Sequence, residues 1–202
     1  VSTMPMAGLS APYSMSGLLT LTHAEALFGI TLAQLVNPGI TTVHAGLPAI
    51  ANIEKNYAVD LGHPAHHLAN LLMEKVNQQL GLPSIQSTGT TNADKPGPRA
   101  EADAAYAFAL LKTYGFHQMR HAFGFLKDLV SFSIGKLRHH IELCAAAKPA
   151  RFLNPLVESF DDQGLAAIQR NASNPNYMRD DHTLSRMARS FQPEAFVSDA
   201  GS

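Results

Sequence analysis

Residues 37–45 read Asn-Pro-Gly-Ile-Thr-Thr-Val-His-Ala, a helix stop followed at once by a short β-branched run. Proline and glycine just past a last turn end a helix, and Ile, Thr and Val favour extended backbone. Before this stop, apolar residues recur at helical spacing over Leu18–Val36, which predicts an amphipathic helix. The segment from residue 18 to residue 45 is therefore expected to be a helix, a tight turn and a strand.

The same pattern recurs on both sides of this segment. The predicted strands are Val1–Met6, Ile40–Ala45, Ser84–Ser87 and Phe116–Ala122. The predicted helices are Leu18–Val36, Pro64–Leu80, Arg99–Tyr114 and Leu126–Ala147, the last with an interruption near Ser131–Gly135. Alternation of strand, loop and helix predicts an α/β fold with a parallel sheet and right-handed crossovers.

The loops differ at the two ends of these strands. Those that follow the strands are rich in Gly, Ser and Thr, whereas the helix-to-strand turns are tight and hold Gly or Pro. This asymmetry is typical of a (β/α)8 (TIM) barrel, whose ligand site lies at the carboxyl ends of the strands. Four units make only half of such a barrel, and a doubly wound open sheet fits the alternation equally well.

The pattern changes at Lys148, where prolines and an Asp-Asp pair separate shorter predicted helices. These helices lie near Leu156–Ser159, Gln163–Arg170 and His182–Ser190. We therefore expect βα units of a barrel over residues 1–147 and a helical C-terminal extension over residues 148–202. Because the chain opens directly on a predicted strand, we expect the C-terminal portion of a longer protein, with a trimmed complete domain as the alternative.

Composition excludes several classes of protein. The 202 residues are 46% hydrophobic and 15% charged with a net charge of −1, which fits a folded domain and gives no footprint for nucleic acid. Polar residues interrupt the apolar runs before the roughly 20 residues that a membrane span needs, so we expect no membrane association. The single cysteine, Cys144, allows no disulfide within the chain, which fits a cytoplasmic location.

Three runs of residues resemble the trimethylamine methyltransferase family, which includes glycine betaine methyltransferases. They are Pro5–Pro12 (Pro-Met-Ala-Gly-Leu-Ser-Ala-Pro), Ala24–Leu27 (Ala-Glu-Ala-Leu) and Ala33–Gly39 (Ala-Gln-Leu-Val-Asn-Pro-Gly). Weaker likenesses are His121–Gly124, Ile141–Leu143 and Asn174–Arg179. The resemblance implies a (β/α)8 barrel that passes a methyl group from trimethylamine or glycine betaine to Co(I) of cobalamin. It also implies a corrinoid protein as the separate partner that carries this cofactor.

The loop after the third strand bears on the substrate. Some members of the family carry pyrrolysine in or near this loop, whereas Thr88–Pro98 holds only ordinary residues. Relatives commonly show Asp-x-Gln-Ala-x-Tyr-Glu at the next helix. Here Ala104 and Tyr106 match, while Glu101, Asp103 and Ala107 replace the other three. A quaternary ammonium leaves as a neutral amine without a proton, but a tertiary amine must first be activated. A quaternary substrate such as glycine betaine is therefore favoured over trimethylamine.

The first candidate for a catalytic residue is His121, in His-Ala-Phe-Gly at the end of the fourth predicted strand. Its imidazole can bind a substrate carboxylate or donate a hydrogen bond, and a structural histidine is the alternative. Phe123 and Phe125 lie beside it and are predicted to bind substrate, since aromatic faces attract ammonium groups. Core packing is the alternative for both rings.

Further substrate-binding candidates follow the second and third strands. His44 is predicted to end the second strand, again with a structural histidine as the alternative. The hydroxyl-rich loop after the third strand is expected to line the pocket or to contact the corrinoid, or else to be a solvated loop. Its candidates are Thr90, Thr91 and Asn92, next to Thr88.

The same residues leave other chemistry and other functions open. The helical pair His140 and Cys144, with His139, and the cluster of His63, His66 and His67 lack the closed ligand set of a zinc site, so no metal is predicted. A barrel enzyme for a phosphorylated metabolite is one alternative function. A non-catalytic protein or barrel fragment that binds quaternary amines is another. Because half a barrel has an open edge, we expect a homo-oligomer or a covering partner.

Overall fold

The computed structural model describes residues 1–147 and 162–190. Its central feature is a set of parallel strands in chain order. β1 (Ser2–Thr3) pairs with β3 (Ala45–Gly46), a parallel bridge joins His44 to Ser84, and β6 (Gln86–Ser87) pairs with β7 (Met119–Arg120). The predicted parallel pairing of the four strands is therefore confirmed.

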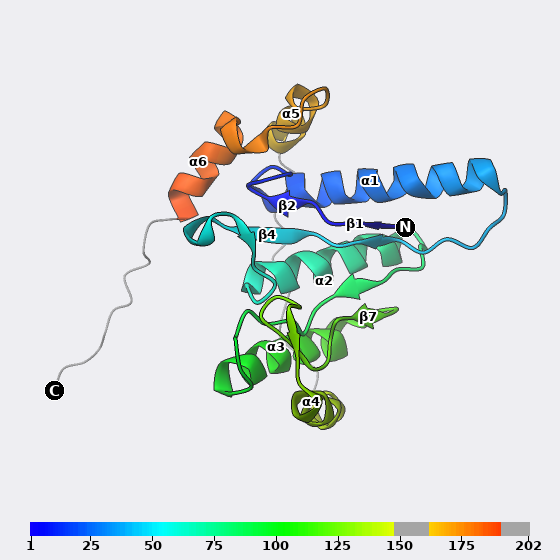
Figure 1. Cartoon of the computed structure of the whole chain (residues 1–202). Coiled ribbons are helices and arrows are strands. Elements are labelled where there is room, and N and C mark those ends of the chain that lie inside the picture. The colour runs from blue at the N-terminus through cyan, green and yellow to red at the C-terminus, as the bar shows by residue number, and fades with distance from the viewer. Residues whose placement is uncertain (148–161, 191–202) are drawn as a thin grey trace.

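One helix follows each of these strands, and Figure 1 shows the four helices succeeding one another in chain order. They are α1 (Met15–Val36), α2 (Pro64–Gln79), α3 (Pro98–Tyr114) and α4 (Ile134–Ala146). Local chemistry sets their ends: Ser14 and Ser133 cap α1 and α4, and proline occupies the first turn of α2 and α3. The chain thus contains four consecutive βα units.

The strands present one face to these helices and one face away from them. Thr3, His44 and Ser84 bond to side chains on α1 or α2, so they face the helices. Ser2 and Arg120 lie on the opposite face, where Arg120 Nη2 donates to Ser2 Oγ at 2.9 Å. Ser2 lies in β1 and Arg120 in β7, and in a flat sheet three strand spacings of about 4.8 Å would separate these two strands. The bond therefore requires the sheet to curl toward this side, which we call the concave face.

Irregular strand-end segments cover the carboxyl edge of the first two strands. β2 (Met6–Ala7) pairs with β4 (Ala49–Asn52), which pairs antiparallel with β5 (Ala58–Val59) after the 3-10 turn η1 (Ile53–Lys55). The sequence pattern predicted only a loose region between residues 45 and 60. The second strand also begins at residue 44, later than the predicted residue 40.

The prediction of a helix from Leu126 is wrong for its first part. β8 (Phe125–Leu126) and β9 (Ser131–Phe132) form an antiparallel hairpin, and α4 begins only at Ile134. The turn holds three consecutive non-glycine residues with positive φ, at 49°, 50° and 74° for residues 127–129. Hydrogen bonds from Lys127 N to Ala93 O and from Asp128 N to Thr91 O hold it in place. Contacts with a distant loop thus override local helix propensity.

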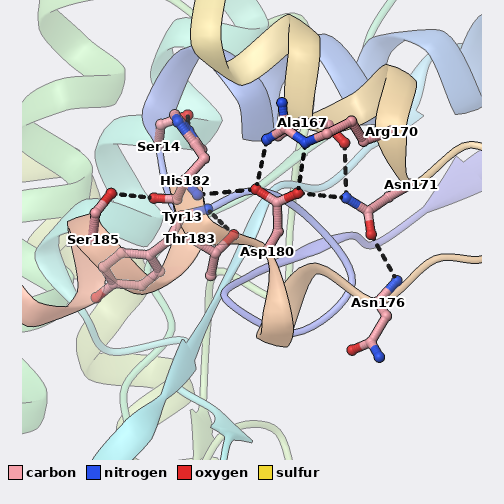
Figure 2. Close-up of polar contacts among 10 residues, drawn as sticks. All are labelled: Tyr13, Ser14, Ala167, Arg170, Asn171, Asn176, Asp180, His182, Thr183 and Ser185. Carbon is pink, nitrogen blue, oxygen red and sulfur yellow. Dashed lines mark hydrogen bonds and ion pairs between the residues drawn. The ribbon is translucent and has the colours of Figure 1, made fainter.

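The described part of the C-terminal region is helical and packs at the start of α1. It consists of α5 (Asp162–Arg170), the 3-10 turn η2 (Tyr177–Arg179) and α6 (Asp181–Ser190). Figure 2 shows Asp180 binding the Arg170 guanidinium. His182 Nε2 lies 3.1 Å from Ser14 Oγ. The two helices predicted at residues 163–170 and 182–190 are confirmed, and the one predicted at Leu156–Ser159 lies outside the described residues.

By length and composition alone, α1 is apolar enough to cross a membrane, and it is the one such helix in the described ranges. Its 22 residues have a mean hydropathy of 1.3, so this apolar stretch is longer than the sequence reading expected. In the structure, Leu18, Thr22 and Ala26 of α1 are buried, and Leu18 joins a core cluster with Ala7 and Ile50. The helix therefore packs one side against the sheet.

Candidate active site at the carboxyl ends of the strands

His121 lies directly after β7, at the carboxyl edge of the parallel strands. Its Nδ1 is 3.2 Å from Ser87 Oγ, which ends the neighbouring strand. The Phe125 ring stands edge-on to the imidazole, with 5.8 Å between ring centroids and an interplanar angle of 88°. Burial, with a smaller contribution from Arg120, lowers the pKa of His121. The structure thus brings together two predicted site residues, His121 and Phe125, and the imidazole of His121 is neutral.

Phe123 has a different neighbour from Phe125. Its ring packs on Phe108 of α3 with 5.4 Å between centroids, in the cluster that also contains Ala104 and Ala122. Core packing, the alternative considered for this residue, describes that placement.

His44 begins its strand and does not end it, so the reason for predicting it at the site is wrong. The imidazole is fully buried on the helix-facing side, with Nε2 3.1 Å from His23 Nδ1 on α1 and Nδ1 3.1 Å from Asn77 Nδ2 on α2. Burial lowers the pKa of His44 to about 4. Because His44 faces the helices, its side chain joins α1 to α2 and is turned away from the concave face.

The three polar residues predicted in the loop after β6 make hydrogen bonds within the protein. Thr90 Oγ1 donates to Leu61 O at 2.5 Å, and Thr91 Oγ1 donates to Asp103 Oδ2 at 2.6 Å. Asn92 Nδ2 donates to Asp60 Oδ1 at 2.7 Å. Both threonines are buried, which is incompatible with the solvated-loop alternative. This loop therefore joins the ends of neighbouring strands.

Arg120 is a site residue that the sequence reasoning missed. It lies on the concave face one position before His121, and Ser2 Oγ accepts from its Nη2. Within residues 1–147 and 162–190, no carboxylate forms an ion pair with it, and its buried Nε has no partner. Burial lowers the pKa of Arg120. A guanidinium in this setting is suited to bind an anionic group such as a carboxylate. The sequence held one signal for Arg120: it directly precedes the candidate His121 in a predicted strand, where side chains alternate between the two faces.

Two buried histidines near the start of α2 contact the segments that follow the strands. His66 Nδ1 lies 3.1 Å from Pro48 O, and His67 Nδ1 lies 2.9 Å from Thr88 Oγ1. Burial lowers the pKa of His66 to about 3 and that of His67 to about 4. Both rings are therefore neutral supports for the strand-end segments.

The histidines that lie near other possible metal ligands make contacts within the protein. His140 is buried, with Nε2 3.3 Å from Glu101 Oε2 and Nδ1 3.4 Å from Ala122 O. Cys144 packs at the edge of the apolar cluster around Phe108. No group of three or more His, Cys, Asp or Glu side chains that could hold a metal ion occurs in the described part of the chain.

The sequence of the chain is similar to those of known proteins. Residues 1–202 match the family model described as trimethylamine methyltransferase. A glycine betaine methyltransferase of Desulfitobacterium hafniense is 23% identical over 193 residues, which cover 95% of this chain and 39% of that protein. A trimethylamine methyltransferase of Methanosarcina barkeri is 27% identical over 178 residues, covering 88% and 35%.

A proline betaine:corrinoid methyltransferase of Eubacterium limosum is 29% identical over 114 residues, which cover 56% of this chain and 23% of that protein. The chain thus spans about two fifths of the length of the glycine betaine methyltransferase and less of the other two. Since the family model covers the whole chain, the family assignment does not depend on any one relative. The chain belongs to the trimethylamine methyltransferase family.

Proposed function

We propose that the protein containing this chain transfers a methyl group from a quaternary methylated amine to the Co(I) corrinoid of a partner protein. The match of all 202 residues to the family carries this proposal. The names of these relatives include trimethylamine, glycine betaine and proline betaine. The arrangement around His121 and Arg120 adds a reason to choose among these amines.

The choice of a quaternary amine rests on leaving-group chemistry. When its carbon–nitrogen bond breaks, the electron pair stays on nitrogen and a neutral tertiary amine departs, so no proton is required. A tertiary amine leaves as a neutral amine only while it carries a proton, and the lowered pKa of His121 makes that side chain a poor donor of one near neutral pH. The corrinoid supplies the nucleophile and accepts the methyl group. The protein's own contribution is to orient the amine and to exclude water.

Within the site we assign the two ends of a betaine to different side chains. Arg120, which has no carboxylate partner in the described residues, would bind the substrate carboxylate on the concave face. Phe125 would place its ring against the ammonium group, as aromatic faces attract cations. Its edge-on contact with His121, the residue after Arg120, places the ring at the same strand end as Arg120. A glycine betaine-like zwitterion fits this pair better than trimethylamine, which has no anionic group.

We also propose that the four βα units are part of a (β/α)8 barrel. Parallel pairing in chain order and one helix after each strand support it. The hydrogen bond between Arg120 and Ser2 adds the curvature that closure requires.

The test uses the full-length protein, a Co(I) corrinoid protein and one methylated amine at a time. Methylation of the corrinoid changes its absorbance, and we expect the change with glycine betaine and little or none with trimethylamine. If none of the methylated amines supported turnover, the proposal would be refuted. Glycine betaine binding without turnover would point to a binding protein.

A further inference from the structure

Asp128, in the turn of the β8–β9 hairpin, is bound to the segments that follow two other strands. Its Oδ1 accepts from Leu61 N at 2.7 Å, and its own N donates to Thr91 O at 3.0 Å. Leu61 follows β5 in the second βα unit, and Thr91 follows β6 in the third. One residue of the fourth unit therefore joins three consecutive strand ends.

The backbone at this position is held in a conformation that its sequence does not favour. Asp128 has φ +50°, between Lys127 at +49° and Leu129 at +74°. Residues with a β-carbon rarely adopt this region, and a run of three persists only where surrounding contacts impose it. The bonds to Leu61 and Thr91, with Lys127 N donating to Ala93 O, are the contacts that impose it here.

A second carboxylate also binds the segment that follows β6. Asp60, next to Leu61, accepts from Asn52 Nδ2 at 2.9 Å and from Asn92 Nδ2 at 2.7 Å. Asp128 is half-buried, and burial, with a further contribution from Asp60, raises its pKa while the Leu61 bond opposes that rise. Hydrogen bonds to a charged acceptor are stronger than neutral ones, so the Asp128 carboxylate is a firm anchor.

The turn sets the position of the site's aromatic ring. Phe125 begins β8, two residues before the left-handed run, and its ring contacts both His121 and Phe132 of β9. If the turn were released, β8 would lose its register with β9, and the ring would leave the imidazole. The anchor therefore acts on the site through Phe125.

We propose that Asp128 is a positioning residue, whose carboxylate seats the hairpin on the two neighbouring strand ends and thereby holds Phe125 against His121. Its effect on substrate rests on the proposed function, whereas its effect on the strand ends does not. Loss of the carboxylate frees the Leu61 amide and loosens β8. Substrate binding weakens because the ring that faces the ammonium is no longer fixed.

Three substitutions in the full-length protein separate the carboxylate from the backbone strain. D128A removes the acceptor and keeps the strain, D128G removes both, and D128N keeps an oxygen acceptor on a residue that tolerates positive φ. We measure amide hydrogen exchange at Leu61 and across residues 125–132, and KM and kcat for glycine betaine.

We expect D128A and D128G to speed exchange at Leu61 by about tenfold or more, because one charge-assisted hydrogen bond is lost. D128N, which keeps a neutral oxygen acceptor, should speed it by clearly less. The KM for glycine betaine should rise by a similar factor in D128A and D128G, with a much smaller change in kcat. Wild-type exchange at Leu61 in D128G would overturn the proposal, even if D128A failed to fold. Absence of turnover in the wild-type protein would refute the proposed function and leave the exchange result to decide this one.

Discussion

Ser87 and His121 end neighbouring parallel strands and meet through a contact of 3.2 Å between Ser87 Oγ and His121 Nδ1. The two residues are 34 positions apart in the chain, so only the parallel pairing of β6 with β7 brings them together. His121 itself has φ +59°, an uncommon conformation for a residue with a β-carbon. Strain at the carboxyl edge of a sheet, beside an aromatic ring, is the pattern expected of a functional position.

Replacing His121 by alanine is expected to lower kcat/KM for methyl transfer by about 100-fold, because the Phe125 ring loses the imidazole that it packs against and the substrate is no longer held in position. Steady-state assays with glycine betaine measure this change. His139→Ala is the matched control, because its exposed imidazole lies on α4. Equal activity of the two variants would remove His121 from the machinery.

Arg120 is expected to act on the anionic end of the substrate. R120M should raise the KM for glycine betaine at least tenfold, since a charged hydrogen bond to the carboxylate is lost. It should leave methyl transfer from tetramethylammonium, which lacks a carboxylate, within about twofold of wild type. An identical loss with both amines would show that Arg120 supports the fold and does not bind the carboxylate.

Gly89 is expected to tolerate no side chain. It has φ +79°, and an added β-carbon would meet Ala122 O at 2.8 Å. G89A should therefore lower the free energy of unfolding by about 2 kcal/mol or more. The control is G39A, where φ is +83° but nothing lies within 4 Å, so only the backbone cost of about 1 kcal/mol applies. Chemical denaturation compares them, and equal losses would contradict the close approach.

Much of the helix layer was predictable from local chemistry. Caps and breakers such as Ser14, Pro64 and Gly115 act within a few residues of the helix ends, so the first three helices came out within a few residues at both ends. The fourth begins eight residues later than predicted. The β8–β9 hairpin was not predictable, because its left-handed turn depends on Thr91 and Ala93, more than 30 positions away in the chain.

Site residues depend on which face of a strand they occupy, and the sequence alone left that open. His44 and Arg120 both sit in short parallel strands, but His44 faces the helices and Arg120 faces the concave side. A strand start that is wrong by four residues was enough to misplace His44. The complete barrel, the homo-oligomer and the cytoplasmic location stay predictions.

Acid is expected to destabilise the fold through its buried histidines. His44, His66 and His67 have pKa values of about 4, 3 and 4 in the folded protein, below the ordinary value of about 6.5 in an unfolded chain. Folding therefore favours their neutral forms. Their stabilisation is complete above pH 6.5 and is lost as pH falls toward 4.

At pH 5 the free energy of unfolding should be lower than at pH 7 by roughly 1 to 2 kcal/mol for each of these histidines. Chemical denaturation at both pH values measures this difference. A stability that does not change over this range would mean that the three imidazoles are not buried as neutral groups.

The balance of methyl groups tests the central claim most directly. Glycine betaine with a carbon-13-labelled methyl group is mixed with the full-length protein and the Co(I) corrinoid protein, and products are counted by NMR. Transfer from a quaternary amine predicts one dimethylglycine for each methyl group gained by the corrinoid. Methylated corrinoid without dimethylglycine, or unchanged glycine betaine beside an active corrinoid protein, would contradict the account.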